Sequence, residues 1–222
     1  MRYRLYYWPW IQGRGEFVRL ALEAAGAEYD DVARGDEANG AGVAALRRLM
    51  SGEEGSRPPY APPFLKAGRL VIGETSNILG YLGPRLGLVP KSEAGSLWAH
   101  QLQLALANFV DETHDTHHPL GSALYYEEQR REAKKRSANF LEVRVPKYFG
   151  YFERLLAANA TGVLIGKRLT YPDLSLFQVV AGLRYAFPNA IAGIEKKHRR
   201  LGALHDRVAA KPRIAAYLAS ER

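Results

Sequence analysis

The spacing of apolar residues divides the chain into a mixed first part and a helical second part. Residues 2–7 alternate and are rich in tyrosine, as in a strand, whereas residues 15–25 repeat apolar side chains at helical spacing and stop at Gly26. Residues 34–59 are rich in Gly, Glu, Ser and Pro, which predicts an irregular, exposed segment. Strands are predicted at 2–7, 28–32, 64–66 and 70–72, and helices at 15–25, 43–50 and 76–82. The order β-α-β followed by β-β-α predicts a compact α/β domain over residues 1–83.

From residue 92 onward the apolar residues recur at helical spacing, which predicts an all-helical second domain over 92–222. The intervening residues 84–91 are rich in Gly and Pro and predict a linker. Thr170 and Asp173 have the spacing of a capping box at the start of one of these helices. Four apolar stripes are expected to form the core: Trp98, Leu102, Ala105, Leu106, Phe109 and Val110; Phe140, Leu141, Val145, Tyr148, Phe152 and Leu155; Leu174, Phe177, Val180 and Ala181; and Leu201, Leu204 and Val208.

Charge is unevenly distributed along the chain. Residues 1–83 hold 10 Lys+Arg and 10 Asp+Glu, so the whole net charge of +8 falls in residues 84–222. The two most charged runs, 127–136 and 195–200, contain no aromatic residues on which bases could stack. We therefore interpret both runs as solvated helix faces and expect no nucleic-acid partner.

Several other classes of protein are disfavoured by composition. The chain has no cysteine, which excludes disulfides, cysteine-ligated zinc and a cysteine nucleophile. No apolar run approaches the ~20 residues that span a membrane, so no membrane partner is expected. The first residues lack the apolar core of a signal peptide, and the expected location is the cytoplasm.

The segment from Tyr60 to Leu79 carries the most specific chemistry. A Pro-marked turn leads into two short strands, and Glu74-Thr75-Ser76 then opens a helix. The free N–H groups and the dipole of a helix start favour an anion. This arrangement suits a small peptide-like ligand held by backbone on one side and by side chains on the other.

Five motifs follow one another along the chain: Tyr6-Tyr7-Trp8-Pro9, Gly13-Arg14-Gly15 with the helix after it, Ala61-Pro62-Pro63-Phe64, Glu74-Thr75-Ser76-Asn77-Ile78-Leu79, and Ile165-Gly166 with Leu169-Thr170 and Asp173. In this order they make the chain resemble the soluble, cytosolic-type glutathione S-transferases of the tyrosine-type class. The resemblance implies an α/β + all-α fold, with an N-terminal thioredoxin-like domain and a C-terminal helical bundle. It also implies an enzyme that transfers glutathione to a hydrophobic electrophile, and a homodimer. Two departures are one extra residue before Gly13 and a longer segment at 34–59.

The resemblance assigns roles to individual residues. Tyr7 would be the catalytic hydroxyl, and Ala61 would offer its backbone to glutathione with Pro62 in cis, Pro63 being the competing choice. Thr75 and Glu74 would bind the γ-glutamyl group. The remaining assignments are Arg14, Arg47 or Arg48 for the glycyl carboxylate, Asp111 or Asp115 for the γ-glutamyl ammonium in the neighbouring subunit, and Trp8, Trp10, Tyr125 and Tyr126 for the electrophile.

The chemistry requires a group that stabilises a thiolate. A free thiol has a pKa near ~8.5, and a hydrogen bond donated to sulfur lowers that pKa. Tyr7 is preferred over Tyr6 because it precedes Trp-Pro, while alternation sends Tyr6 to the opposite face. Residues 8–15 contain no Ser, Thr or Cys, which argues against the serine and cysteine types of the family.

Two other interpretations compete with this one. His114 and His118 are four residues apart, the spacing for a shared helix face, but the motif is not His-Glu-x-x-His and Pro119 follows at once, so no metal is expected. The alternative function is a non-catalytic glutathione-binding or interaction module, because a fold does not fix a function.

Overall fold

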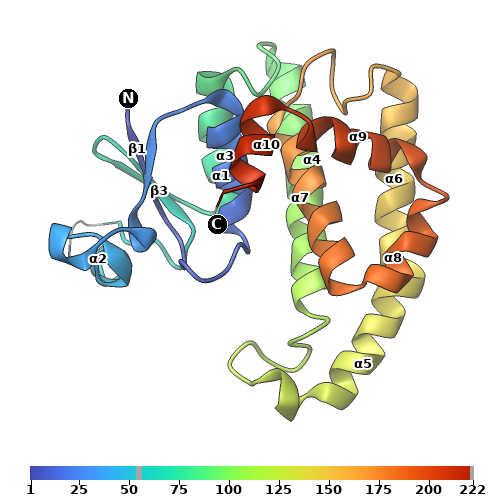
Figure 1. The fold of residues 1–222 in the computed structure, drawn as a ribbon, viewed down its shortest axis with the longest axis horizontal. Helices are drawn as coiled ribbons and strands as arrows, with labels where there is room; N and C mark the ends of the chain where they lie inside the picture. Colours follow the sequence, from blue (N-terminus) through green and yellow to red (C-terminus); the bar gives the residue numbers. More distant parts are fainter. Residues whose placement is uncertain (54–56, 221–222) are drawn as a thin grey trace. The chain divides into compact units, whose positions relative to one another are not determined.

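The computed structural model describes residues 1–53 and 57–220, and it divides into two compact units. The first unit contains residues 1–96 together with residues 209–220, and the second contains residues 97–208 (Figure 1). No helix in the described part of the chain is both long enough and apolar enough to cross a membrane.

A four-stranded mixed sheet forms the centre of the first unit, in the order β2-β1-β3-β4. Its strands are β1 (Tyr3–Tyr6), β2 (Tyr29–Asp31), β3 (Phe64–Ala67) and β4 (Leu70–Gly73). β1 pairs with β2 in parallel and with β3 antiparallel, and β3 and β4 form an antiparallel hairpin. This confirms the predicted α/β unit, with each predicted strand found within two residues of its expected bounds.

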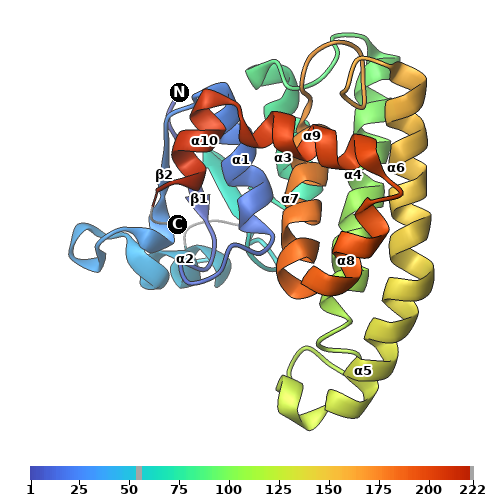
Figure 2. The same ribbon diagram turned by 45° about the vertical axis from the view of Figure 1, so that its right-hand side comes forward.

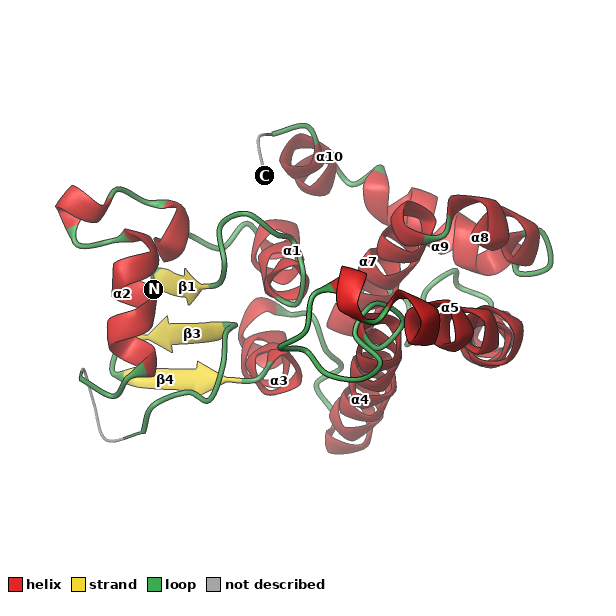
Figure 3. Cartoon of the chain, turned by 90° about the horizontal axis from the view of Figure 1, so that it is seen from below, coloured by secondary structure: helices red, strands yellow, loops and turns green. Residues whose placement is uncertain are grey.

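Helices cover both faces of this sheet (Figure 3). On one face, α1 (Gly15–Ala25) and α3 (Thr75–Leu86) pack through Val18, Leu22, Ile78 and Leu82 onto Tyr3, Leu5 and Leu65. On the other, α2 (Gly42–Met50) packs through Ala45, Leu46 and Leu49 onto Tyr6 and Phe64. The alternation that separates Leu5 from Tyr6 is the one expected for a strand. α1 has the predicted bounds, while α3 continues through Pro84 and ends four residues later than expected.

The end of the chain also belongs to the first unit. α10 (Pro212–Leu218) lies beside α1, as Figures 2 and 3 both show. Ile214 and Tyr217 of α10 are buried. Residues more than 180 positions apart in the sequence are therefore packed together around α1.

The second unit is helical, as predicted. Its elements are α4 (Glu93–His114), whose first turn belongs to the first unit, the 3-10 turn η3 (Tyr126–Glu128), α5 (Arg130–Asn139), the π-helical turn η4 (Phe140–Arg144), α6 (Val145–Asn159), α7 (Tyr171–Ala186), α8 (Pro188–Glu195) and α9 (Arg199–Ala209). α5, η4 and α6 follow one another without a break (Figure 2).

Thr170 and Asp173 form the predicted capping box of α7. The backbone N–H and the hydroxyl of Thr170 both donate to Asp173 Oδ2, at 2.7 and 2.6 Å.

The core stripe of α6 differs from its prediction. Phe149 and Leu156 of α6 are fully or almost fully buried, whereas the expected Tyr148 and Leu155 are only partly so. The reason is the π-helical turn at Phe140–Arg144, because a π turn holds more residues than an α turn and changes which side of the following helix faces the core.

Candidate active site

Tyr7 lies directly after the end of β1, with 5% of its surface exposed. Its hydroxyl oxygen accepts a hydrogen bond of 2.9 Å from the backbone N–H of Arg14, in the segment that leads into α1. Because that N–H occupies a lone pair of the oxygen, the hydroxyl proton remains available for donation to another group. Tyr6, by contrast, is stacked on Phe64 with ring centroids 5.0 Å apart in the core between the sheet and α2.

Two glycines make room for the Tyr7 side chain. A Cβ built on Gly13 would overlap the Tyr7 hydroxyl, and one built on Gly15 would overlap its ring. Gly13 also has φ of +42°, which disfavours any side chain. The Gly13-Arg14-Gly15 motif therefore has a physical meaning in this chain: the backbone passes against Tyr7 closely enough for the N–H of Arg14 to reach its hydroxyl.

The ionisation of Tyr7 is the balance of two opposing effects. Burial raises its pKa above the ordinary value, and the N–H of Arg14, the charges of Arg14 and Arg19 and the N–H of Gly15 partly offset that rise. The net shift is upward, so the side chain is a neutral phenol at physiological pH. A neutral phenol donates a hydrogen bond, and an anion beside it would be stabilised.

The start of α3 contacts the backbone carbonyl of Arg14, the residue whose N–H contacts Tyr7. The hydroxyl of Thr75 is 3.4 Å from the carbonyl oxygen of Arg14, to which it donates. Glu74, just before the helix, is exposed and has φ of +65°, a left-handed backbone angle that is uncommon for a residue with a side chain. Tyr7 and Thr75 are thus both hydrogen-bonded to one peptide segment, which connects the end of β1 to the N-terminus of α3.

The cis peptide bond is at a different position from the one expected. It joins Pro62 and Pro63, so the expectation of a cis bond before Pro62 is wrong, and Pro63 is the competing choice that the structure selects. Ala61 is then two residues before the cis proline, and Pro62 is the residue adjacent to it. Pro62 has no N–H group, so at that position the backbone offers only a carbonyl.

The other residues expected in the first unit differ in their exposure. Trp8 is half-buried and Trp10 is 68% exposed, and their rings stack with centroids 5.8 Å apart. Arg14 is half-buried. Arg47 and Arg48 are exposed in the last turn of α2, and no hydrogen bond or ion pair between described residues joins either of them to Tyr7 or Thr75.

The remaining expected residues belong to the second unit. Asp111 and Asp115 are exposed near the end of α4, and Asp115 lies 3.8 Å from the guanidinium of Arg136. Tyr125 is 77% exposed and caps η3, and Tyr126 is 41% exposed. Asp111, Asp115, Tyr125 and Tyr126 therefore remain predictions as far as a ligand is concerned.

The histidines near the end of α4 do not form a metal cluster. His114 and His118 stack with ring centroids 4.9 Å apart, and His118 Nδ1 lies 3.2 Å from the carbonyl of Leu124. Within residues 1–53 and 57–220, no group of three or more His, Cys, Asp or Glu side chains is arranged to hold a metal ion.

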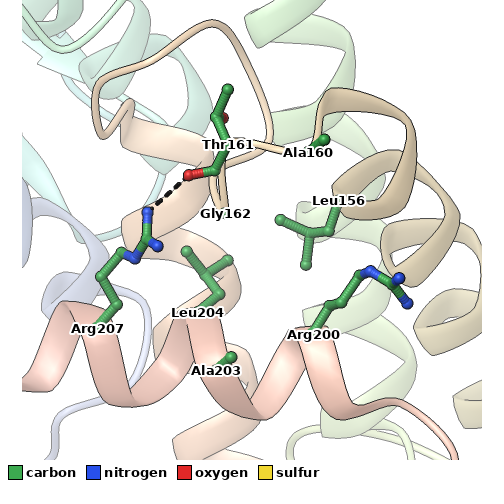
Figure 4. A pocket seen from close by; sticks show the side chains of 8 residues that line it. All are labelled: Leu156, Ala160, Thr161, Gly162, Arg200, Ala203, Leu204 and Arg207. Carbon is green, nitrogen blue, oxygen red and sulfur yellow. Dashed lines mark hydrogen bonds between the residues drawn. The ribbon is translucent and has the colours of Figure 1, made fainter.

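A separate hollow of about 310 Å³ lies in the second unit, between the end of α6, the 160–162 turn and α9 (Figure 4). Leu156 and Leu204 line its centre. Arg207 donates to the carbonyl of Thr161 at 2.8 Å, and Arg200 is ion-paired with Glu153 at 3.1 Å. Both guanidinium groups are thus used in holding the fold, and the hollow shares no residue with the surroundings of Tyr7.

Sequence reasoning missed a buried polar cluster beside Tyr7. Glu16 and Arg19 of α1 are both completely buried, although the spacing in that helix predicts only apolar residues for the core. Arg19 Nε donates to Asp31 Oδ2 at 2.6 Å, and the Tyr217 hydroxyl donates to Glu16 Oε2 at 2.9 Å. The available signal was a pair of opposite charges three residues apart, which ordinarily indicates a solvated helix face.

Comparison with known proteins agrees with this fold. The family model described as "Glutathione S-transferase, C-terminal domain" matches residues 114–221. A glutathione S-transferase of Plasmodium falciparum (isolate 3D7) is 25% identical over 224 residues, covering 98% of this chain and 95% of that protein.

Solved structures show the same fold. Prostaglandin synthase D of Nilaparvata lugens superposes with a TM-score of 0.77 at 20% identity, covering 100% of this chain and 99% of the other. Na-GST-3 of the hookworm Necator americanus, described as a monomeric glutathione S-transferase, gives a TM-score of 0.76 at 19% identity over 100% and 99% of the two chains. These matches show that this chain is similar to glutathione S-transferases over nearly its whole length.

Proposed function

We propose that this protein is a glutathione S-transferase of the tyrosine type, in which the Tyr7 hydroxyl donates a hydrogen bond to the sulfur of bound glutathione. The observation that carries this proposal is the buried, neutral Tyr7 whose oxygen accepts from the N–H of Arg14 and whose proton remains for donation. A hydrogen bond to the charged form of sulfur lowers the thiol pKa. A drop of about two pKa units would stabilise the thiolate by ~2.7 kcal/mol.

The reaction follows from the thiolate. Its lone pair forms a new bond from sulfur to an electrophilic carbon of the second substrate. Where that carbon bears a leaving group, the bond to it breaks and its electron pair departs with the group. Where the carbon belongs to an activated double bond, the π electrons move to the neighbouring atom, which then takes a proton from water.

Glutathione is a co-substrate in this proposal, and no metal is required. The first N–H groups of α3 would bind the γ-glutamyl carboxylate, together with the hydroxyl of Thr75, whose proton would turn from the carbonyl of Arg14 to the ligand. Glu74 would attract the ammonium of the same group. The backbone at Ala61 and Pro62 would pair with the cysteinyl part. Because Pro62 has no N–H, its carbonyl alone is available there, and Ala61 would have to supply the donor.

The remaining assignments extend the same proposal. Arg14 is the leading choice for the glycyl carboxylate over Arg47 and Arg48, because the backbone of Arg14 already contacts both Tyr7 and Thr75. Trp8 and Trp10 offer an aromatic surface to a hydrophobic electrophile. Tyr125 and Tyr126 are proposed for the same substrate, and Asp111 or Asp115 for the γ-glutamyl ammonium in the neighbouring subunit.

A cytoplasmic location and a homodimer complete the proposal. Since Na-GST-3 is described as monomeric, the fold does not by itself require a dimer. Sedimentation at micromolar concentration tests the assembly: a dimer is expected, and a monomer would remove Asp111 and Asp115 from the site.

The decisive experiment is a titration of the glutathione thiol on the protein. Thiolate absorbance is followed against pH with glutathione in excess of the binding sites, and the same titration is repeated with Tyr7→Phe. The bound thiol should ionise about two pKa units below free glutathione, and Tyr7→Phe should remove most of that difference. Binding without any change in the thiol pKa would identify a non-catalytic module instead.

A further inference from the structure

Arg19 lies next to Tyr7 in an environment that is unusual for a charged side chain. It is completely buried in α1, and its guanidinium carbon is 5.7 Å from the centroid of the Tyr7 ring. Burying a guanidinium is costly unless it is paired and hydrogen-bonded, and apolar residues of the same volume often serve stability as well or better. A buried arginine in this position therefore needs a reason beyond packing.

Three elements of the first unit hold the guanidinium in place. Nε donates to Asp31 of β2 at 2.6 Å, and Nη1 lies 3.5 Å from the carboxylate of Glu16, one turn earlier in α1. Tyr217 of α10 donates its hydroxyl to the same Glu16 oxygen at 2.9 Å. The carboxylates of Asp31 and Glu16 thus hold a buried cation, and the C-terminal helix fixes one of them.

The pairing is incomplete. Within the described residues, Nη2 of Arg19 and Oδ1 of Asp31 are buried without a hydrogen-bond partner. A cluster selected only for stability would be expected to satisfy these atoms, because each unpaired buried polar group costs free energy. The unpaired edge of the cation and its place near the Tyr7 ring indicate that its charge acts on the tyrosine.

We propose that Arg19 is a positioning residue for Tyr7: its buried charge, fixed by Asp31 and Glu16, holds the phenol ring and makes the hydroxyl more acidic and hence a stronger donor. The link to catalysis rests on the function proposed above. The effect on Tyr7 is a property of the protein alone and is measurable without glutathione.

The charges around Tyr7 have opposite expected effects. A cation near the ring favours the phenolate and lowers the pKa of Tyr7, in agreement with the part that Arg14 and Arg19 play in offsetting burial. Asp31 and Glu16 partly cancel the charge of Arg19, so removing one of those carboxylates should lower the Tyr7 pKa further. The groups to be considered are Arg14, Glu16 and Arg19 from α1 and the segment before it, Asp31 and Arg34 from β2 and the turn that follows, and Tyr217 from α10.

The test is a titration of Tyr7 in the full chain with labelled tyrosine, followed by NMR. The Tyr7 resonance is assigned from its absence in Tyr7→Phe, and circular dichroism confirms that each variant stays folded through the pH range. Arg19→Met should raise the Tyr7 pKa by about two units, the order expected for one charge at 5.7 Å and an effective dielectric of ~20. Arg19→Lys keeps the charge and should restore most of the shift. Asp31→Asn should move the pKa downward.

If the Tyr7 pKa rises in Arg19→Met and falls in Asp31→Asn, the role of Arg19 is electrostatic. A packing defect would have no reason to shift the Tyr7 pKa in opposite directions in the two variants. If Arg19→Met does not fold, Asp31→Asn decides alone. An unchanged Tyr7 pKa, or an upward shift in Asp31→Asn, would overturn the inference. If the Tyr7 pKa responds as expected but bound glutathione does not ionise, the proposed function fails and the role of Arg19 stands.

Discussion

The backbone N–H of Arg14 donates to the hydroxyl oxygen of Tyr7 over 2.9 Å, seven residues back along the chain. In this hydrogen bond the phenol oxygen is the acceptor, so its own proton remains available for donation. The hydrogen bond depends on two glycines, on the end of β1 and on the start of α1.

Replacing Tyr7 with Phe should slow conjugation at about pH 6.5 by tenfold or more, because a thiol with a pKa near ~8.5 is scarcely ionised there. The deficit should shrink as pH rises, since the thiol then ionises without help. The measurement is a pH profile of kcat/KM with an electrophile in excess. Tyr6→Phe is the matched control and should leave the profile unchanged, because Tyr6 is buried against Phe64 and α2. The reverse result would show that the wrong tyrosine has been assigned.

Replacing Thr75 with Ala should weaken glutathione binding. Losing a hydrogen bond to a charged group costs about 1.5–3 kcal/mol, which corresponds to tenfold or more in the dissociation constant. Calorimetric titration measures the change, and Thr75→Ser should restore most of the affinity because it keeps the hydroxyl. An unchanged dissociation constant in Thr75→Ala would remove this residue from the site.

Replacing Gly15 with Ala should reduce both stability and activity, because the new methyl group would overlap the Tyr7 ring. Overpacking of this kind typically costs about 1–3 kcal/mol. Gly202→Ala in α9 is the matched control: nothing lies within 4 Å of the added methyl group. That change should raise the free energy of unfolding by about 0.4–1 kcal/mol. Urea denaturation compares the two, and equal effects would contradict the close approach at Gly15.

Replacing Asp173 with Ala should strongly destabilise the helical unit. The carboxylate accepts from the N–H of Leu164 at 2.7 Å and from both the N–H and the hydroxyl of Thr170. Leaving these buried donors unpaired should cost about 3–5 kcal/mol in the free energy of unfolding. Asp206→Ala, where the side chain is 78% exposed, should cost far less. Comparable losses in denaturant titrations would argue against the buried capping box.

The ion pair between Glu112 and Arg144 should make stability depend on pH. The guanidinium donates two hydrogen bonds of 2.7 and 2.6 Å to the carboxylate, and this pairing lowers the pKa of Glu112 below its usual value. Because the folded pKa is lowered, the stabilisation is present above the unfolded pKa of ~4.3 and is lost as pH falls through the folded pKa.

Glu112→Gln measures this contribution. The difference in the free energy of unfolding between the wild type and Glu112→Gln should be largest near neutral pH and should vanish in acid. Glu127→Gln is the control, because Glu127 and Arg130 form an exposed pair in which both side chains are 66% accessible. A pH-independent difference for Glu112→Gln would mean that the pair stabilises through packing alone.

Local patterns anticipated most of the elements. The bounds of α1 agree with the apolar spacing and with the stop at Gly26, and the capping box of Thr170 and Asp173 is present as expected. These features depend on neighbours within a few residues, and the chain encodes them in consecutive positions. The π-helical turn at Phe140–Arg144 was not anticipated, because nothing in that stretch distinguishes it from an ordinary helix.

For the site, the sequence by itself determined the residue types and their order. It placed a tyrosine at the end of the first strand, a glycine pair before the first helix, and a hydroxyl at the start of α3. Tertiary structure alone decided that Arg14 contacts both Tyr7 and Thr75, that the cis bond precedes Pro63, and that Arg19 is buried with Asp31 and Glu16 while Tyr217 closes the cluster. The physical reason is that burial and pairing of a charge depend on residues brought together from distant parts of the chain, and here up to 201 positions separate two hydrogen-bonded side chains.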